Sequence, residues 1–297
     1  EWLVESGSGQ GRKLSPDLFN IACLSQALLC LISEFAGYAD DGIDIVTGTS
    51  VSDCNAKLKS IAQERVVWYK NIGLPLNIDK TVTMGFGFEP SPIEIGGITI
   101  FPKSEMTFLG FTIQNDLKWS SQISRLCNKI RSAAGRIRAD GRHLTTADKR
   151  MLYMGWIQSV IFSNSLVVLT SISMAEMSDL QTACNAGIRA MMGIPKFGYA
   201  DITSIRKKFR IPSVEEIVEY SLQCAAWKMF GNCSFECSGP VTRSRANLNL
   251  PHPDQRRHCA KSSATFLTKA WNRIPLAVKQ EEKLQHVKHQ LKRSIFV

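Results

Sequence analysis

The chain has 297 residues, of which 44% are hydrophobic and 21% charged, and this composition excludes an intrinsically disordered protein. Its net charge is +10, but residues 1–120 hold 9 Lys and Arg against 14 Asp and Glu, whereas residues 121–297 hold 27 against 12. The acidic first part suits metal binding and the basic second part suits nucleic acid, although basic residues on solvated helix faces would give the same count.

Cysteine usage and hydropathy indicate the compartment. Nine cysteines without regular spacing do not suggest a disulfide framework. The longest apolar run, residues 18–35, contains Asn20, Gln26 and Glu34, so it is too polar for a membrane span, and it lacks the basic start of a signal peptide. We therefore expect an intracellular protein of the cytoplasm or nucleus that is neither secreted nor bound to a membrane.

The first elements combine a glycine-rich loop, a helix and an acidic hairpin. Residues 7–11 form the loop, and Ser15-Pro16 starts a helix expected to run to about residue 34. Tyr38-Ala39-Asp40-Asp41 then predicts a strand, a turn at residues 40–42 and a return strand. Two adjacent carboxylates in an apolar stretch are costly unless a cation pairs with them, so this hairpin is a candidate metal site.

The segment from residue 52 to residue 120 predicts one helix followed by short strands. The helix begins near Ser52 and ends at Gly73, with an apolar face that comprises Leu58, Ile61, Ala62, Val66 and Tyr69. The strands are expected at residues 81–88, 93–95, 98–101 and 107–113, with Gly96-Gly97 as a hairpin turn. Helices packed on an antiparallel sheet make the fold class α+β.

The chain beyond Trp119 reads as helical. One apolar stripe comprises Leu126, Ile130, Ala133, Ala134 and Ile137, and basic residues fill most of the remaining face. Capping boxes are predicted at Thr145–Asp148, Ser173–Glu176 and Ser213–Glu216. Helices should end at Gly193 and Gly231, a loop should cover residues 232–262, and a last amphipathic segment should cover residues 266–296.

Two further residue groups are weak indications of a binding site. The set Cys233, Cys237, His252, His258 and Cys259 could suggest zinc, but its spacing differs from the tight pairs of structural zinc sites. The aromatic residues Trp227, Phe230 and Trp271 lie among apolar residues, which favours core packing over stacking on bases.

Four ordered segments between residues 7 and 119 carry a resemblance: Gly7-Ser8-Gly9-Gln10-Gly11 with its following helix start, Tyr38–Asp41, Gly73–Thr81, and Phe108-Leu109-Gly110-Phe111 with Asp116–Trp119. Together they resemble the reverse transcriptases of non-LTR, LINE-type retrotransposons. Residues 270–275, Ala-Trp-Asn-Arg-Ile-Pro, resemble the ending of several such elements.

The resemblance implies residue roles in nucleotide transfer. Asp40 and Asp41 would hold Mg²⁺ or Mn²⁺, Tyr38 would face the primer end or the template, and Lys80 would neutralise the pyrophosphate leaving group. Gly9, Gln10 and Gly11 would lie against the incoming deoxynucleotide triphosphate and the template. The implied partners of the intact protein are an RNA template, a DNA primer and deoxynucleotide triphosphates.

The same resemblance implies further binding elements and a domain order. The hairpin at residues 108–111 would position the primer, and the helix at 124–139 would contact duplex phosphates. The order is an incomplete polymerase palm at 1–120, a helical thumb at 121–195 and a basic helical C-terminal segment at 196–297.

Each motif has a plainer alternative. Asp40-Asp41 could be an ordinary acidic turn, and residues 7–11 a plain loop. Lys80 could be a solvated lysine, residues 108–111 a core strand, and the arginines of 125–142 a solvated face.

The resemblance calls for a third metal-binding carboxylate before the glycine-rich loop, but only six residues precede Gly7, and the chain starts at Glu1 rather than Met. We therefore expect a fragment of an RNA-directed DNA polymerase that is inactive, or nearly so, by itself. Two alternatives remain open: a non-enzymatic nucleic-acid-binding remnant, and an interaction domain built on the helices of 145–230.

Overall fold

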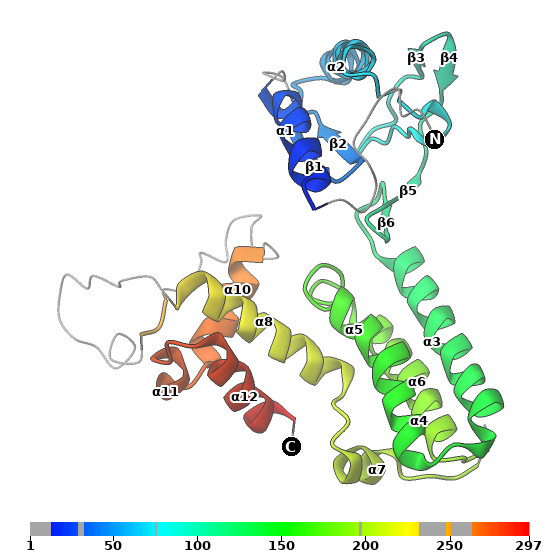
Figure 1. Ribbon diagram of the computed structural model, residues 1–297, viewed down its shortest axis with the longest axis vertical. Coiled ribbons are helices and arrows are strands. Elements are labelled where there is room, and N and C mark those ends of the chain that lie inside the picture. Colours follow the sequence, from blue (N-terminus) through cyan, green and yellow to red (C-terminus); the bar gives the residue numbers. More distant parts are fainter. Residues whose placement is uncertain are drawn as a thin grey trace. The chain divides into compact units, whose positions relative to one another are not determined.

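A computed structural model describes residues 13–28, 33–74, 76–195, 198–231, 248–250 and 263–296. The chain divides into two compact units, Glu1–Gln122 and Ile123–Val297. Figure 1 draws the first in blue to green and the second in green to red. The first mixes helices with short antiparallel strands and the second is helical in its described residues, so the fold is α+β in general terms.

Two helices belong to the first unit. Helix α1 spans Ser15–Leu28, so the expected helix is too long, because Glu34 already starts a strand. Helix α2 spans Val51–Asn71. The hydroxyl of Ser50 accepts a hydrogen bond from the N–H of Asp53 at its start, and Gly73 follows its end with a φ of 72°. Both ends of α2 thus have the capping chemistry that helices require.

The strands of the first unit form separate hairpins. They are β1 (Glu34–Tyr38) with β2 (Asp41–Ile45), β3 (Ile93–Ile95) with β4 (Ile98–Ile100), and β5 (Glu105–Phe108) with β6 (Phe111–Gln114), each pair antiparallel. Within the described residues these pairs do not join, so the prediction of one sheet carrying packed helices is wrong.

The predicted strand at residues 81–88 is also wrong. After the 3₁₀ turn η1 (Ile78–Lys80), only Thr83 forms an isolated bridge, with Pro102. A Cβ added at Gly85 would lie 2.3 Å from the carbonyl oxygen of Phe88. The backbone therefore folds back on itself here, which an extended strand does not do.

A small apolar core holds the β3–β4 hairpin. Ile93, Ile95 and Ile100 are buried. Partly buried side chains from α2 and from the segment around η1 pack against them: Leu58, Ala62, Val66, Leu76 and Ile78. The turn between the strands has φ values of 58° at Gly96 and 82° at Gly97, so the predicted Gly-Gly turn is confirmed.

Helix α3 spans Ser120–Asp140 and leads into the second unit. There the elements are η2 (Gly141–His143), α4 (Thr146–Tyr153), the π-helical turn η3 (Met154–Gln158), α5 (Ser159–Asn164), α6 (Met174–Met191), α7 (Ile202–Phe209) and α8 (Val214–Phe230). All five residues of the predicted apolar stripe of α3 are buried, because this face packs inside the unit.

Hydrogen bonds confirm the three predicted capping boxes. In each, the Ser or Thr hydroxyl accepts from the backbone N–H three residues on, and the acidic side chain there accepts from the cap N–H. Gly193, with a φ of 71°, follows α6, and Gly231 ends α8, as expected. These short-range signals mark where α4, α6 and α8 start.

The C-terminal region is three helices rather than one segment: α10 (Ser263–Arg273), α11 (Leu276–Lys279) and α12 (Leu284–Ile295). Pro275 separates the first two. Helix α8 packs against α10 and α12, as Figure 1 also shows. Trp227 and Trp271 are buried in this core and the ring of Phe230 meets that of Trp271 edge to face, which confirms the predicted packing role of all three.

Candidate functional site

The tip of the β1–β2 hairpin carries the acidic pair. Tyr38 pairs with Asp41 across the strands, so the turn residues are Ala39 and Asp40, one position earlier than expected. Ala39 has a φ of 52°, a conformation that costs an L-residue some strain. Tyr38, Asp40 and Asp41 are all exposed. The expectation that the carboxylates lie in an apolar setting is therefore wrong, because both face solvent.

Phe35 shapes the hairpin behind this tip. Gly37 and Gly42 are cross-strand partners, and a Cβ on either would lie 3.0 to 3.1 Å from the Phe35 ring. The ring thus lies directly over the backbone of both strands. The guanidinium of Arg65, from α2, sits 4.5 Å from the centre of the same ring. These contacts pack the hairpin against α2.

An ion pair completes that attachment. The Arg65 Nη2 and Nε atoms donate to the two carboxylate oxygens of Asp44 at 2.6 and 2.9 Å, and the Ser33 hydroxyl donates to Asp44 at 3.1 Å. Arg65 is only 6% exposed, and paired, bidentate geometry is what a buried guanidinium requires.

Sequence analysis missed the Arg65–Asp44 pair, although two signals were present. Arg65 interrupts the apolar face of α2, four residues after Ile61 and four before Tyr69. Asp44 stands between Ile43 and Ile45 in a strand. A charge in each of two apolar patterns indicates that the charges pair with one another.

Asp40 and Asp41 differ from Asp44, which pairs with Arg65. Neither side chain forms a hydrogen bond or an ion pair with any residue that the structure describes. Oxygen ligands suit Mg²⁺ and Mn²⁺, so this donor set fits a hard divalent cation. Within the described residues, no group of three or more potential metal ligands is assembled, so this pair would leave most coordination positions to water or substrate.

The contacts of Lys80 involve Asn77 rather than the two carboxylates of the hairpin tip. It ends η1, where its backbone N–H donates to the Asn77 side chain at 3.2 Å, and the Thr81 hydroxyl donates to the Asn77 carbonyl at 2.8 Å. Its ammonium group is exposed and makes no ion pair with Asp40 or Asp41. Asn77 therefore fixes the local turn, and Lys80 projects from it.

Residues 108–111 form a tight hairpin turn rather than part of one strand over 107–113. Leu109 and Gly110 have φ values of 48° and 82° between β5 and β6. Two glutamines tie this hairpin to the start of α3. The Oε1 of Gln122 accepts from the Thr112 N–H, and the Oε1 of Gln114 accepts from the Ser121 N–H. The Gln114 contact also caps the helix.

Helix α3 presents a basic face. The side chains opposite its buried stripe are exposed and include five cations: Arg125, Lys129, Arg131, Arg136 and Arg138. Two of these also make contacts within the second unit, since Arg136 lies 4.5 Å from the ring centre of Trp156 and Arg138 donates to the carbonyl of Ile194 at 3.3 Å. Lys129 and Arg131 are exposed along the helix, where a polyanion could reach them.

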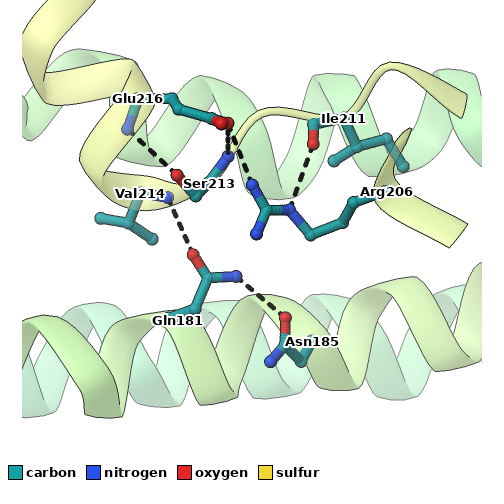
Figure 2. Close-up of polar contacts among 7 residues, drawn as sticks. All are labelled: Gln181, Asn185, Arg206, Ile211, Ser213, Val214 and Glu216. Atoms are coloured by element: carbon teal, nitrogen blue, oxygen red, sulfur yellow. Dashed lines mark hydrogen bonds and ion pairs between the residues drawn. The ribbon is translucent and has the colours of Figure 1, made fainter. Parts of the chain in front are cut away.

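A second basic region surrounds α7 and is held by the contacts in Figure 2. Arg206 donates to the carbonyl of Ile211 at 3.2 Å and to the carboxylate of Glu216 at 3.0 Å. Gln181 of α6 accepts from the N–H of Val214 at 2.9 Å, so a side chain of one helix caps another. Arg206 is thus structural, and Glu216 serves both this ion pair and its own capping box.

Some predicted site residues are not described. Gly9, Gln10 and Gly11, together with all five candidate zinc ligands, lie outside the described residues.

None of the helices in the described ranges is long and apolar enough to cross a membrane. No protein-family model, curated protein or solved structure matches this chain.

Proposed function

We propose that the chain carries part of an RNA-directed DNA polymerase, with the β1–β2 hairpin as its metal-binding element. The observation that supports this most is the pair Asp40 and Asp41, which is exposed at the hairpin tip and has no described protein partner, while Asp44 behind it is neutralised. The Arg65–Asp44 pair holds the hairpin in place behind this tip, which is the support that a preorganised binding element requires.

The chain's residues would act mainly by positioning. Asp40 and Asp41 would hold Mg²⁺ or Mn²⁺, and the cation, when bound, would stabilise the charges on the attacking and leaving oxygens. Tyr38, which is 69% exposed beside the pair, would contact the primer end or the template. Lys80 would hold the pyrophosphate, and Gly9, Gln10 and Gly11 the nucleotide and template.

Template and primer would contact the elements that follow. The β5–β6 hairpin would hold the primer terminus, and its two glutamine contacts to α3 would keep its position relative to the start of that helix. The exposed cations of α3 would contact duplex phosphates without reading sequence.

Metal binding tests this proposal without requiring activity. Mn²⁺ titrated into the 297-residue chain, followed by calorimetry, should bind at least about tenfold more tightly to the wild type than to the Asp40→Asn, Asp41→Asn variant. Asp116→Asn is the matched control, since Asp116 is an exposed acid in another turn of the first unit, paired with Lys118. Equal affinity in all three proteins would rule the hairpin out as the metal site.

Primer extension on an RNA template measures the reaction itself. The resemblance implies a third metal-binding carboxylate on a strand ahead of the glycine-rich loop. Among the residues given ahead of that loop, the acidic ones are Glu1 and Glu5. We expect the 297 residues alone to give little or no synthesis, and any synthesis to disappear in the Asp40→Asn variant. Synthesis that survives this substitution would contradict the proposal.

A second candidate function is nucleic-acid binding without catalysis, favoured by the basic face of α3. It predicts duplex binding that is indifferent to the Asp40 and Asp41 substitutions. Lys129→Gln with Arg131→Gln should lower the slope of log affinity against log salt by about two units. Duplex binding together with absent metal binding would favour this second function over the first.

A further inference from the structure

A groove in the second unit combines an apolar floor with a basic rim. Its floor is one face of α8, where Tyr220, Cys224 and Ala225 line it. One wall comes from Phe162 of α5 and from Leu166 just after this helix, and the other comes from α12. The cavity has a volume of about 410 Å³, which lies in the range of pockets that hold small organic groups.

Three lysines line this groove. Lys228 lies at the end of α8, and Lys288 and Lys292 lie one helical turn apart on α12. All three are exposed, and the Nζ of Lys292 lies 5.8 Å from the ring centre of Tyr220. None of the lining residues is acidic. The ligand that fits must therefore carry negative charge and an apolar face at the same time.

The side chains below the rim keep the floor apolar. Tyr220 and Cys224 are buried, and burial raises the pKa of the Cys224 thiol, against the opposing effects of its hydrogen bond with Tyr220 and of the three lysines. The Tyr220 ring is braced by Phe162 and Phe296, with ring centres 6.0 and 5.2 Å away. Leu166 is 46% exposed, so an apolar wall meets solvent beside the cations.

We propose that this groove binds single-stranded nucleic acid, with a base against the apolar surface and the flanking phosphates on the three lysines. Bases offer apolar faces, and phosphates supply a regular row of negative charge, which together match the floor and the rim. A duplex keeps its base faces stacked inside, so it could satisfy the lysines but not the floor. The inference goes beyond the proposed function and stands without the hairpin metal site.

The first experiment measures strand binding. A fluorescein-labelled oligothymidylate of about 20 nucleotides should bind the Lys228→Gln, Lys288→Gln, Lys292→Gln variant about tenfold more weakly than the wild type. The salt slope should fall by about two units, because single strands lose about 0.7 per phosphate contact. Affinity for a duplex should fall by a smaller factor, because a duplex contacts the lysines without covering the floor. The Lys129→Gln, Arg131→Gln variant of α3 is the matched control and should show the opposite pattern.

The second experiment tests the apolar wall that contains Leu166. Leu166→Ala should weaken binding of the oligothymidylate but not of an abasic strand of the same length, since only the first places a base on that wall. Leu166 is half exposed, so the variant should fold, and thermal melting by circular dichroism checks this for every variant.

Three outcomes would overturn the inference. In the first, the folded lysine variant binds the oligothymidylate as tightly as the wild type does. In the second, the wild type binds the abasic strand as tightly as the oligothymidylate. In the third, a duplex displaces the oligothymidylate from the wild type as effectively as an unlabelled single strand does. Binding of an acidic peptide of alternating Glu and Leu that depends on the same lysines, without binding of the oligothymidylate, would assign the groove to an acidic protein partner instead.

Discussion

Different kinds of interaction stabilise the interior of each of the two units. In the first, polar contacts hold two of the described hairpins, the acidic hairpin by the Arg65–Asp44 pair and the β5–β6 hairpin by two glutamines, while β3–β4 packs on a small apolar core. In the second, long helices bury large apolar side chains, with Trp271, Ile157 and Leu291 almost fully enclosed. Polar fastening leaves strand tips free to present functional groups, whereas apolar packing builds a rigid surface that carries charge on its outside.

Removing Trp271 should have the largest effect and should be confined to the second unit. The side chain is 1% exposed, its ring contacts Phe230, and its Nε1 donates to the carbonyl of Leu248 at 2.7 Å. Trp271→Ala should cost about 3–5 kcal/mol of unfolding free energy, because it leaves a cavity and an unsatisfied carbonyl. Urea unfolding followed by circular dichroism measures this.

The same variant tests whether the units are independent. Hydrogen exchange of the α2 amides, which belong to the first unit, should be unchanged in Trp271→Ala. Faster exchange there would show that packing in one unit stabilises the other, and the contrast drawn above would fail.

Breaking the Arg65–Asp44 pair should be the second largest effect and should act on the first unit alone. Asp44→Asn leaves a guanidinium that is 6% exposed without its counter-charge, which costs about 3 kcal/mol. Hydrogen exchange of the β1 and β2 amides should accelerate accordingly. Asp116→Asn, which breaks the exposed pair with Lys118, should cost less than about 1 kcal/mol.

A double variant separates charge burial from packing at this position. In Asp44→Leu with Arg65→Met, both charges are absent and apolar side chains of similar length remain, so most of the lost stability should return. A double variant as unstable as Asp44→Asn would show that the Arg65 contacts with Phe35, rather than the ion pair, hold the hairpin.

Signals within a few residues of each other predicted the structure well. The three capping boxes, the Gly96-Gly97 turn and the end of α6 at Gly193 depend on local backbone chemistry, and all are present. The apolar stripe of α3 was predictable for the same reason, since its period of about 3.6 residues is set by the helix itself.

Features that depend on contacts between distant segments were not predicted. Whether hairpins join into a sheet is decided by which strands meet, and residues 81–88 lack the extended backbone that would let them join. The Arg65–Asp44 pair joins residues 21 positions apart. At the candidate site, the sequence pointed to Asp40 and Asp41, but their exposure and the exact turn position required the structure.

The smallest expected effect concerns Lys279, a buried charge in the core of the second unit that resembles Arg65 in the first. Lys279 is 4% exposed, its Nζ donates to the Asn249 side chain at 2.6 Å, and it lies 5.3 Å from the ring centre of Trp271. Burial disfavours the ammonium form and lowers the pKa of Lys279 from 10.5 to about 8.

The sign of the resulting pH dependence follows from proton binding. Between about pH 8 and 10.5 the unfolded chain keeps the Lys279 proton and the folded chain loses it, so this residue makes the folded state more stable as pH rises. The unfolding free energy of the wild type should therefore gain on that of Lys279→Met by on the order of 2 kcal/mol across this window. Groups that both proteins share cancel in the difference, so a constant gap would show that Lys279 stays charged and that this core accommodates a cation as the first unit does.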